Sequence, residues 1–242
     1  MKKNILALTI SLFSFASIAQ NKADGNLSEW ELPLKNYDLD AHIQYSTTNN
    51  DSMLFLCIRI SDARFQMKIV KGGMSVFIDT TGKKKQFISI NYPVKSNEET
   101  PQKMERPGAG ALDVGQVKKM VEPSLKQFNT KGFITGNGTY IQKNIEGITA
   151  VGAYDEMAIL NIEYQIPFKT FYHDLTTTDK DKKLTLSIVI NGLPMPQFSG
   201  NPPGGDGPPG GGPPAGMPDP QEMEQLFQST TTIIKYSIQL NN

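Results

Sequence analysis

The chain has 242 residues, and its 24 lysine and arginine residues balance its 24 aspartate and glutamate residues, so its formal net charge is zero. This balance excludes the basic excess that is typical of nucleic-acid-binding proteins. Cys57 is the single cysteine, so an intramolecular disulfide is excluded and a hydrophobic core has to stabilise the fold. Because Cys57 lies in an apolar run, we expect it to be a buried hydrophobic residue and not a nucleophile.

The N-terminus is typical of an export signal. Lys2 and Lys3 supply positive charge, residues 5–18 are largely apolar, and Ala19 is a small residue suited to a cleavage site. The apolar run is shorter than the about 20 residues that cross a bilayer. We therefore predict a signal peptide at residues 1–19, a periplasmic or extracellular location, and no membrane span after cleavage.

Alternating apolar and polar residues, the pattern of half-buried strands, recur through the remaining chain. The predicted strands cover residues 39–46, 54–60, 74–79, 86–92, 158–166, 184–190 and 232–240. The second of these has apolar side chains on both faces, which predicts an internal strand. Residues 80–84 form a polar, glycine-containing turn of a hairpin. The pattern predicts an all-β fold, an antiparallel β-sandwich of jelly-roll-like type.

Two short helices are expected in the connections. Asp113 is a candidate N-cap for a helix that contains Val117 and Val121 and ends before Pro123. Asp219 is a candidate N-cap for a second helix, with Pro220 at its first position.

Two segments interrupt the strand pattern. Residues 94–112 form a polar insertion, and residues 200–220 consist almost entirely of glycine and proline. The second segment cannot bury apolar area and is predicted to be disordered. It lacks the strict glycine repeat of collagen. Since the strand that follows is too short to form a domain alone, we interpret this segment as an insertion between neighbouring strands. Residues 20–242 are therefore predicted to form one domain.

Four motifs occur in a recognisable order. The mature chain opens with Asp-Gly-Asn-Leu-Ser-Glu-Trp at residues 24–30, followed by Arg-Ile-Ser-Asp at 59–62, Val-Phe-Ile-Asp at 76–79 and Glu-Tyr-Gln-Ile-Pro at 163–167. The set resembles family 9 carbohydrate-binding modules and their DOMON-like relatives. The resemblance implies a β-sandwich that binds carbohydrate. Sugar-binding members hold a sugar between two tryptophans, whereas this chain has Trp30 alone, at a motif position whose role is structural. We expect Trp30 to be buried.

Exposed aromatic rings are the usual platforms for sugars, because the C–H faces of a sugar pack on them. The candidate ligand-binding residues are Tyr37, Tyr92, Tyr140, Tyr154 and Tyr172, with Arg59 and Asn91 as polar partners. Tyr45, Tyr164 and Tyr236 fall on inward faces and are expected in the core. If sugar binding is correct, at least two of the five candidate rings should lie on one face.

Calcium is the candidate cofactor, because loop carboxylates are the ligands that it prefers. The candidate ligands are Asp24, Glu29, Asp62 and Asp79. Turns and strand ends explain the same residues without a metal. Some DOMON-like relatives bind haem through methionine, histidine or lysine, but no Met/His pair is placed for that role here.

Catalysis is not expected. His42 and His173 are the two histidines, and neither has the partners of a catalytic triad or the spacing of a metal site. Neighbouring carboxylates at residues 98–99 and 155–156 point to opposite faces and do not form a glycosidase pair. We therefore predict a non-catalytic, exported binding module for carbohydrate or another envelope ligand. The alternative hypothesis is an envelope scaffold that binds a protein partner.

Overall fold

The computed structural model describes residues 22–81, 85–94, 114–173, 182–193 and 220–240. The predicted signal peptide, nearly all of the polar insertion and residues 200–219 lie outside this part of the chain, so the predictions about them stay predictions.

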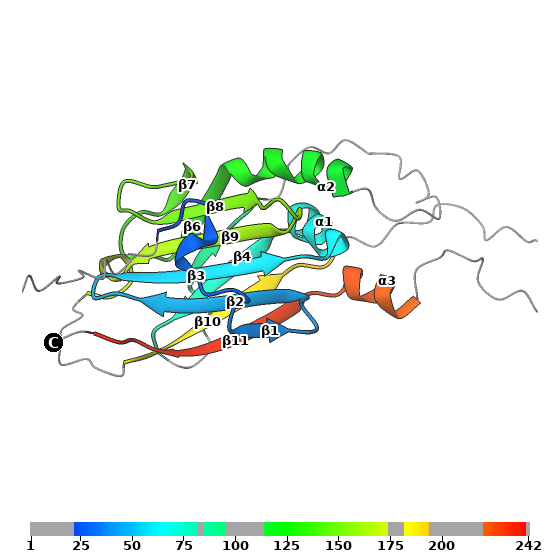
Figure 1. Cartoon of the computed structure of the whole chain (residues 1–242). Coiled ribbons are helices and arrows are strands. Elements are labelled where there is room, and N and C mark those ends of the chain that lie inside the picture. The colour runs from blue at the N-terminus through cyan, green and yellow to red at the C-terminus, as the bar shows by residue number, and fades with distance from the viewer. Residues whose placement is uncertain (1–21, 82–84, 95–113, 174–181, 194–219, 241–242) are drawn as a thin grey trace, which may run out of the picture.

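Two antiparallel sheets pack face to face (Figure 1), which confirms the predicted all-β sandwich. The five-stranded sheet has the order β1-β2-β3-β9-β8, and the six-stranded sheet has the order β11-β10-β4-β5-β6-β7. The first sheet comprises β1 (Asn36–Asp38), β2 (Ile43–Asn49), β3 (Met53–Ile60), β8 (Thr149–Tyr154) and β9 (Leu160–Pro167). The second comprises β4 (Met74–Asp79), β5 (Ile88–Asn91), β6 (Gln127–Lys131), β7 (Gly138–Ile141), β10 (Lys183–Ile190) and β11 (Thr230–Ser237).

Strand β3 is internal, between β2 and β9, as its apolar composition predicts. One face of β3 points into the sandwich, where Leu54, Leu56 and Ile58 are fully buried. Its other face carries Phe55 and Cys57, which form a second, smaller apolar cluster with Trp30 and Leu34. The N-terminal segment therefore covers part of the outer face of the five-stranded sheet.

Several strands differ from the sequence prediction. The strand predicted at residues 39–46 begins only at Ile43, because residues 39–42 form a turn in which His42 has a φ of 52°. Strands β6, β7 and β8 were not predicted at all. They have four to six residues each and contain few large apolar side chains, so the sequence pattern that marks a strand is weak.

Helices α1 (Ala63–Gly72), α2 (Val114–Val121) and α3 (Pro220–Phe227) lie toward one end of the sandwich (Figure 1). The two predicted helices are confirmed as α2 and α3, while their predicted caps lie outside the described residues. Helix α1 was missed. Asp62 caps it by accepting a hydrogen bond from the Arg64 backbone N–H, and its apolar face buries Phe65 and Ile69. Three short 3₁₀ segments complete the elements: η1 (Leu27–Glu29), η2 (Glu122–Lys126) and η3 (Phe168–Thr170).

The strands on either side of the glycine- and proline-rich segment are neighbours, as predicted. Strands β10 and β11 pair from Lys183 with Ser237 to Ile190 with Thr230. Beyond the strands, the Leu193 backbone N–H donates to the Leu226 carbonyl at 2.8 Å. The chain therefore leaves and re-enters the domain at one place.

Replacing residues 200–218 with a short Gly/Ser linker should leave the melting temperature within a few degrees. The reason is that a loop's closure entropy changes by only about 0.6 kcal/mol for each doubling of length, while the contacts at its base are kept. Thermal unfolding of the two chains checks this. A large loss of stability would mean that the segment contributes contacts to the folded domain.

Lys68 is a buried cation at the junction of α1 and α3. Its Nζ donates to the Gln225 carbonyl at 2.7 Å and lies 5.1 Å from the centre of the Phe65 ring. Among the described residues it has no carboxylate partner. Burial lowers the pKa of Lys68 to about 8.

This lowered pKa predicts a pH dependence of stability. Between pH about 8 and about 10.4, the usual pKa of lysine, the unfolded chain keeps a proton at residue 68 that the folded chain has lost. The free energy of unfolding should therefore gain a positive contribution as the pH rises through this window. Lys68→Met should remove that contribution, whereas Lys71→Met on the same helix should keep it. Identical pH profiles of unfolding for both variants would contradict the prediction.

Candidate functional site

The first and last of the four sequence motifs meet at Glu163, on the outer face of β9. Its Oε1 accepts a hydrogen bond from Trp30 Nε1 at 2.7 Å, and its Oε2 accepts from the backbone N–H groups of Asp24 and Gly25 at 3.2 and 2.7 Å. Burial raises the pKa of Glu163 and outweighs these bonds, which favour the ionised form. Trp30 is only 8% exposed, so the prediction that it is structural is confirmed.

The side chains of the four predicted calcium ligands form hydrogen bonds with residues close to them in the sequence. Asp24 accepts a bond from the Asn26 backbone, Glu29 contacts Ser28, and Asp79 accepts bonds from the backbone and hydroxyl of Thr81. Burial acts to raise the pKa of Asp62, but the nearby Arg64 and His42 lower it below its usual range. Within the described ranges, no group of three or more His, Cys, Asp or Glu side chains is placed to hold a metal ion. Calcium binding stays a prediction.

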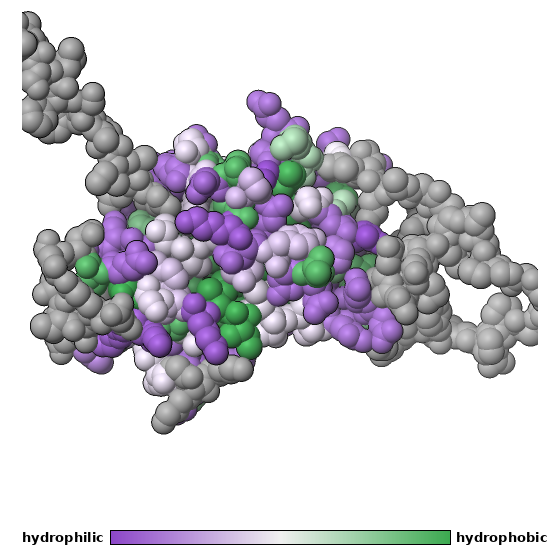
Figure 2. Space-filling model, turned by 60° about the horizontal axis from the view of Figure 1, so that its bottom comes forward, coloured by the Kyte–Doolittle hydropathy of each residue, from purple (hydrophilic) through white to green (hydrophobic). Residues whose placement is uncertain are grey.

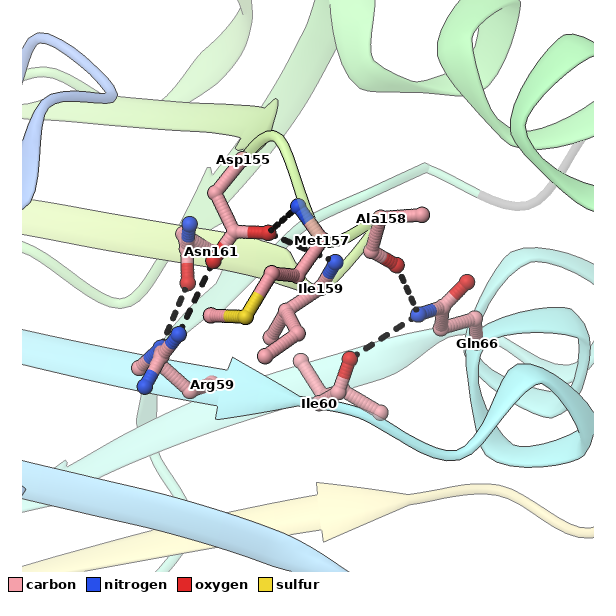
Figure 3. A network of polar contacts seen from close by, with 8 residues as sticks. All are labelled: Arg59, Ile60, Gln66, Asp155, Met157, Ala158, Ile159 and Asn161. Carbon is pink, nitrogen blue, oxygen red and sulfur yellow. Dashed lines mark hydrogen bonds and ion pairs between the residues drawn. The ribbon is translucent and has the colours of Figure 1, made fainter. Parts of the chain in front are cut away.

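Arg59 is held in a polar network at the end of β3 (Figure 3). Its Nε donates to Asn161 Oδ1 at 3.0 Å and its Nη2 to Asp155 Oδ2 at 2.8 Å. Asp155 in turn accepts bonds from the backbone N–H groups of Met157 and Ile159, which closes the turn between β8 and β9. Because its side chain is only 10% exposed and two of its nitrogens are already bonded, little of Arg59 is available to a sugar.

Tyr37 is the one predicted platform whose ring is largely exposed, at 54%. The strand register places it beside Gln44, and Gln44 beside Arg59, across the outer face of the five-stranded sheet. These three residues share a small hollow with His42. Its volume is about 10 Å³, which is room for one water molecule and not for a sugar ring. Gln44 Oε1 is buried there without a hydrogen-bond partner among the described residues.

Two predicted platforms are wrong because they belong to the core. Tyr92 is fully buried, and Tyr172 packs among Phe168 and Phe171. Asn91, their predicted polar partner, accepts a bond from Ser75 Oγ on the outer face of the six-stranded sheet. Strand alternation places a residue on one face or the other, but it does not say which segment covers that face.

A cleft of about 530 Å³ lies at the open edge of the sandwich, between residues of both sheets and of α2 with η2. We call it the edge cleft. Its lining residues come from α2 and η2, from β8, the edge strand of the five-stranded sheet, and from β7 and the start of β6 at the edge of the six-stranded sheet. Figure 1 shows β7, β8 and α2 on the same side of the sandwich. The lining residues are Lys118, Glu122, Leu125, Lys126, Gln127, Ile141, Gln142, Gly152, Ala153 and Tyr154.

The floor of the edge cleft depends on Gly152. A Cβ atom there would lie 2.9 Å from Leu125 Cδ2 and 3.0 Å from the Tyr92 hydroxyl, so a side chain would force the Leu125 or Tyr92 side chain to shift. The Tyr92 hydroxyl donates to the Leu125 carbonyl at 2.9 Å. The same hydroxyl oxygen accepts a hydrogen bond from the Gly152 backbone N–H. Burial raises the pKa of Tyr92 despite this donor, so the phenol stays neutral.

Tyr154 lines the edge cleft and is the one predicted ligand residue found there. Its hydroxyl donates to Gln66 Oε1 at 3.1 Å, so the proton of that hydroxyl is already engaged within the protein. Burial, followed by the charge of Glu122, raises the pKa of Tyr154, which excludes a phenolate at neutral pH. The Lys118 Nζ lies 5.6 Å from the ring centre and 3.6 Å from Glu122 Oε1.

The five candidate tyrosines do not form a shared platform. Tyr140 is half-buried, packs against Phe128 and donates its hydroxyl to the Asn137 carbonyl. Tyr37 lies on the outer face of the five-stranded sheet and Tyr154 in the edge cleft. The expectation that two rings lie together with polar partners between them is therefore not met by the described residues.

Most lining residues of the edge cleft were missed by sequence reasoning. Lys118 and Lys126 lie on either side of the predicted helix end. They line the same cleft as Ile141 and Gln142 because β6 pairs with β7, and that pairing was not predicted. Gly152 was the one sequence feature that could have indicated the cleft, because an isolated glycine in a strand often marks the close approach of another segment.

Comparison with known proteins identifies no relative: no family model, curated protein or solved structure matches the chain. The resemblance to family 9 carbohydrate-binding modules therefore stays a prediction from the motifs. In the part of the chain that the structure describes, no helix has the length and apolar character needed to cross a bilayer.

Proposed function

We propose that this chain is a non-catalytic ligand-binding module and that the edge cleft is its ligand site. The observation that carries the proposal is the cleft itself, whose volume of about 530 Å³ falls in the range of small-molecule sites, roughly 300–1,000 Å³. The hollow beside Tyr37 is smaller by a factor of about fifty, so the cleft is the better candidate.

A saccharide is the ligand type that its lining fits best. Gln127 and Gln142 offer amide donors and acceptors for hydroxyl groups, while Ile141 and the ring of Tyr154 offer apolar surface for C–H groups. With a single ring available, most of the binding energy has to come from hydrogen bonds and not from stacking between two aromatic side chains.

The lining also supports a non-catalytic role. Glu122 is the one carboxylate among the lining residues, whereas glycoside hydrolysis uses a pair. It forms an ion pair with Lys118 Nζ at 3.6 Å and has no second carboxylate beside it in the lining.

The alternative, a scaffold for a protein partner, would be favoured by a contiguous apolar patch larger than about 400 Å². Figure 2 turns the side that carries β1, β10 and β11 toward the viewer. Apolar side chains on this face form small groups separated by hydrophilic ones. This face therefore gives the scaffold hypothesis no specific support.

The test compares two isoleucines of the same surface region. Ile141 lines the edge cleft and is 69% exposed, while Ile145 lies outside it and is 93% exposed. Because both are exposed, Ile141→Glu and Ile145→Glu should both fold. On a glycan array the wild-type chain and Ile145→Glu should bind the same saccharides, and Ile141→Glu should bind none. A wild-type chain that binds no saccharide, or two variants with equal binding, would refute the proposed site.

A further inference from the structure

The charges of the edge cleft narrow the class of ligand. Resting on the proposed function, we propose that the edge cleft selects an acidic saccharide, one that carries carboxylate groups on its sugar rings, over a neutral saccharide of the same size.

The first observation is an uncompensated cation. The lining contains two lysines and one glutamate. Glu122 lies 3.6 Å from the Lys118 Nζ and forms an ion pair with it. Lys126, at the end of η2, is exposed and has no carboxylate partner within the described residues. A bound anion would supply the missing partner and would form a charge-assisted hydrogen bond.

The second observation is the position of Lys118 over the Tyr154 ring, at 5.6 Å from the ring centre. A pyranose that packs against that ring would lie next to the ammonium group. A carboxylate on the sugar can therefore reach a cation without leaving the aromatic surface. A neutral sugar in the same place would make the same contact with the ring but gain no ion pair.

The third observation separates a sugar acid from a simple anion. The cleft presents amide groups at Gln127 and Gln142 and apolar surface at Leu125 and Ile141. Acetate or inorganic phosphate can use the lysines alone. A sugar acid uses both the lysines and the remaining lining, so it should bind more tightly than either small anion.

The experiment is a calorimetric titration of the full chain at low salt with trigalacturonate, with the neutral galactotriose, and with inorganic phosphate or acetate as competitors. Trigalacturonate should bind at least about tenfold more tightly than galactotriose, the factor that corresponds to one charge-assisted hydrogen bond. Lys126→Gln should lose about tenfold in affinity for the acid and leave the neutral sugar unaffected. Lys131→Gln, an exposed lysine of β6 outside the cleft, should retain wild-type affinity for both.

The outcomes distinguish this inference from the proposed function. Equal affinity for the acidic and neutral trisaccharides, with both lost in Ile141→Glu, would overturn the acidic class and keep the edge cleft as the site. Phosphate or acetate that competes as strongly as trigalacturonate would overturn the saccharide class. The absence of binding to both trisaccharides and to every saccharide on the array would overturn both.

Discussion

Trp30→Ala should lower the free energy of unfolding by about 3–5 kcal/mol, as expected for a large buried aromatic side chain. The loss combines two effects. The cluster with Leu34, Phe55 and Cys57 loses its largest member, and Glu163 Oε1 loses the donor at 2.7 Å. Chemical denaturation measures the change.

Trp30→Phe separates the two effects, because it keeps an aromatic ring but removes the indole N–H. Its expected cost is about 1–3 kcal/mol, the penalty for leaving a buried acceptor unpaired. A fluorescence maximum of the wild-type chain typical of water-exposed indole, or a loss below about 1 kcal/mol in Trp30→Ala, would contradict the assigned role.

Tyr92→Phe is expected to cost about 1–3 kcal/mol, although it removes a single oxygen atom. That hydroxyl is buried and connects η2 to β8 through the Leu125 carbonyl and the Gly152 backbone. Without it, the buried Leu125 carbonyl loses its donor, and the Gly152 N–H loses its acceptor. Denaturation of Tyr92→Phe checks the value.

Tyr140→Phe is the matched control, because the Tyr140 hydroxyl also donates to a backbone carbonyl but does so at an exposed site. Water can replace the lost partner there, so its stability should stay within about 0.5 kcal/mol of wild type. If the two phenylalanine variants proved equally stable, the Tyr92 bridge would have no special role in holding the floor of the cleft.

The sandwich could be predicted because the long, half-buried strands show a clear alternation of apolar and polar residues in the sequence. Strand β3 was recognised as internal from its two apolar faces, and Trp30 as structural from its motif. Helix α1 was missed because its motif was interpreted as a strand end. Asp62 does follow a strand, but its side chain begins a helix.

The site could not be predicted to the same degree. Whether a tyrosine on a strand is exposed depends on what covers that face, and Tyr92 is covered by η2, a segment 33 residues later in the chain. Arg59 looked available, but Asp155 and Asn161, about 100 residues away, bind its guanidinium group. The edge cleft arises from contacts between short elements whose patterns are weak, so only Tyr154 was anticipated among its lining residues.

The most direct test of the central claim is a map of backbone amide chemical-shift changes when trigalacturonate is added to the ¹⁵N-labelled chain. The account predicts that the largest changes fall on residues 118–127, 141–142 and 152–154, the segments that supply the lining of the edge cleft. Changes centred instead on Tyr37, Gln44 and Arg59 would place the ligand on the outer face of the five-stranded sheet and would contradict the edge cleft as the binding site.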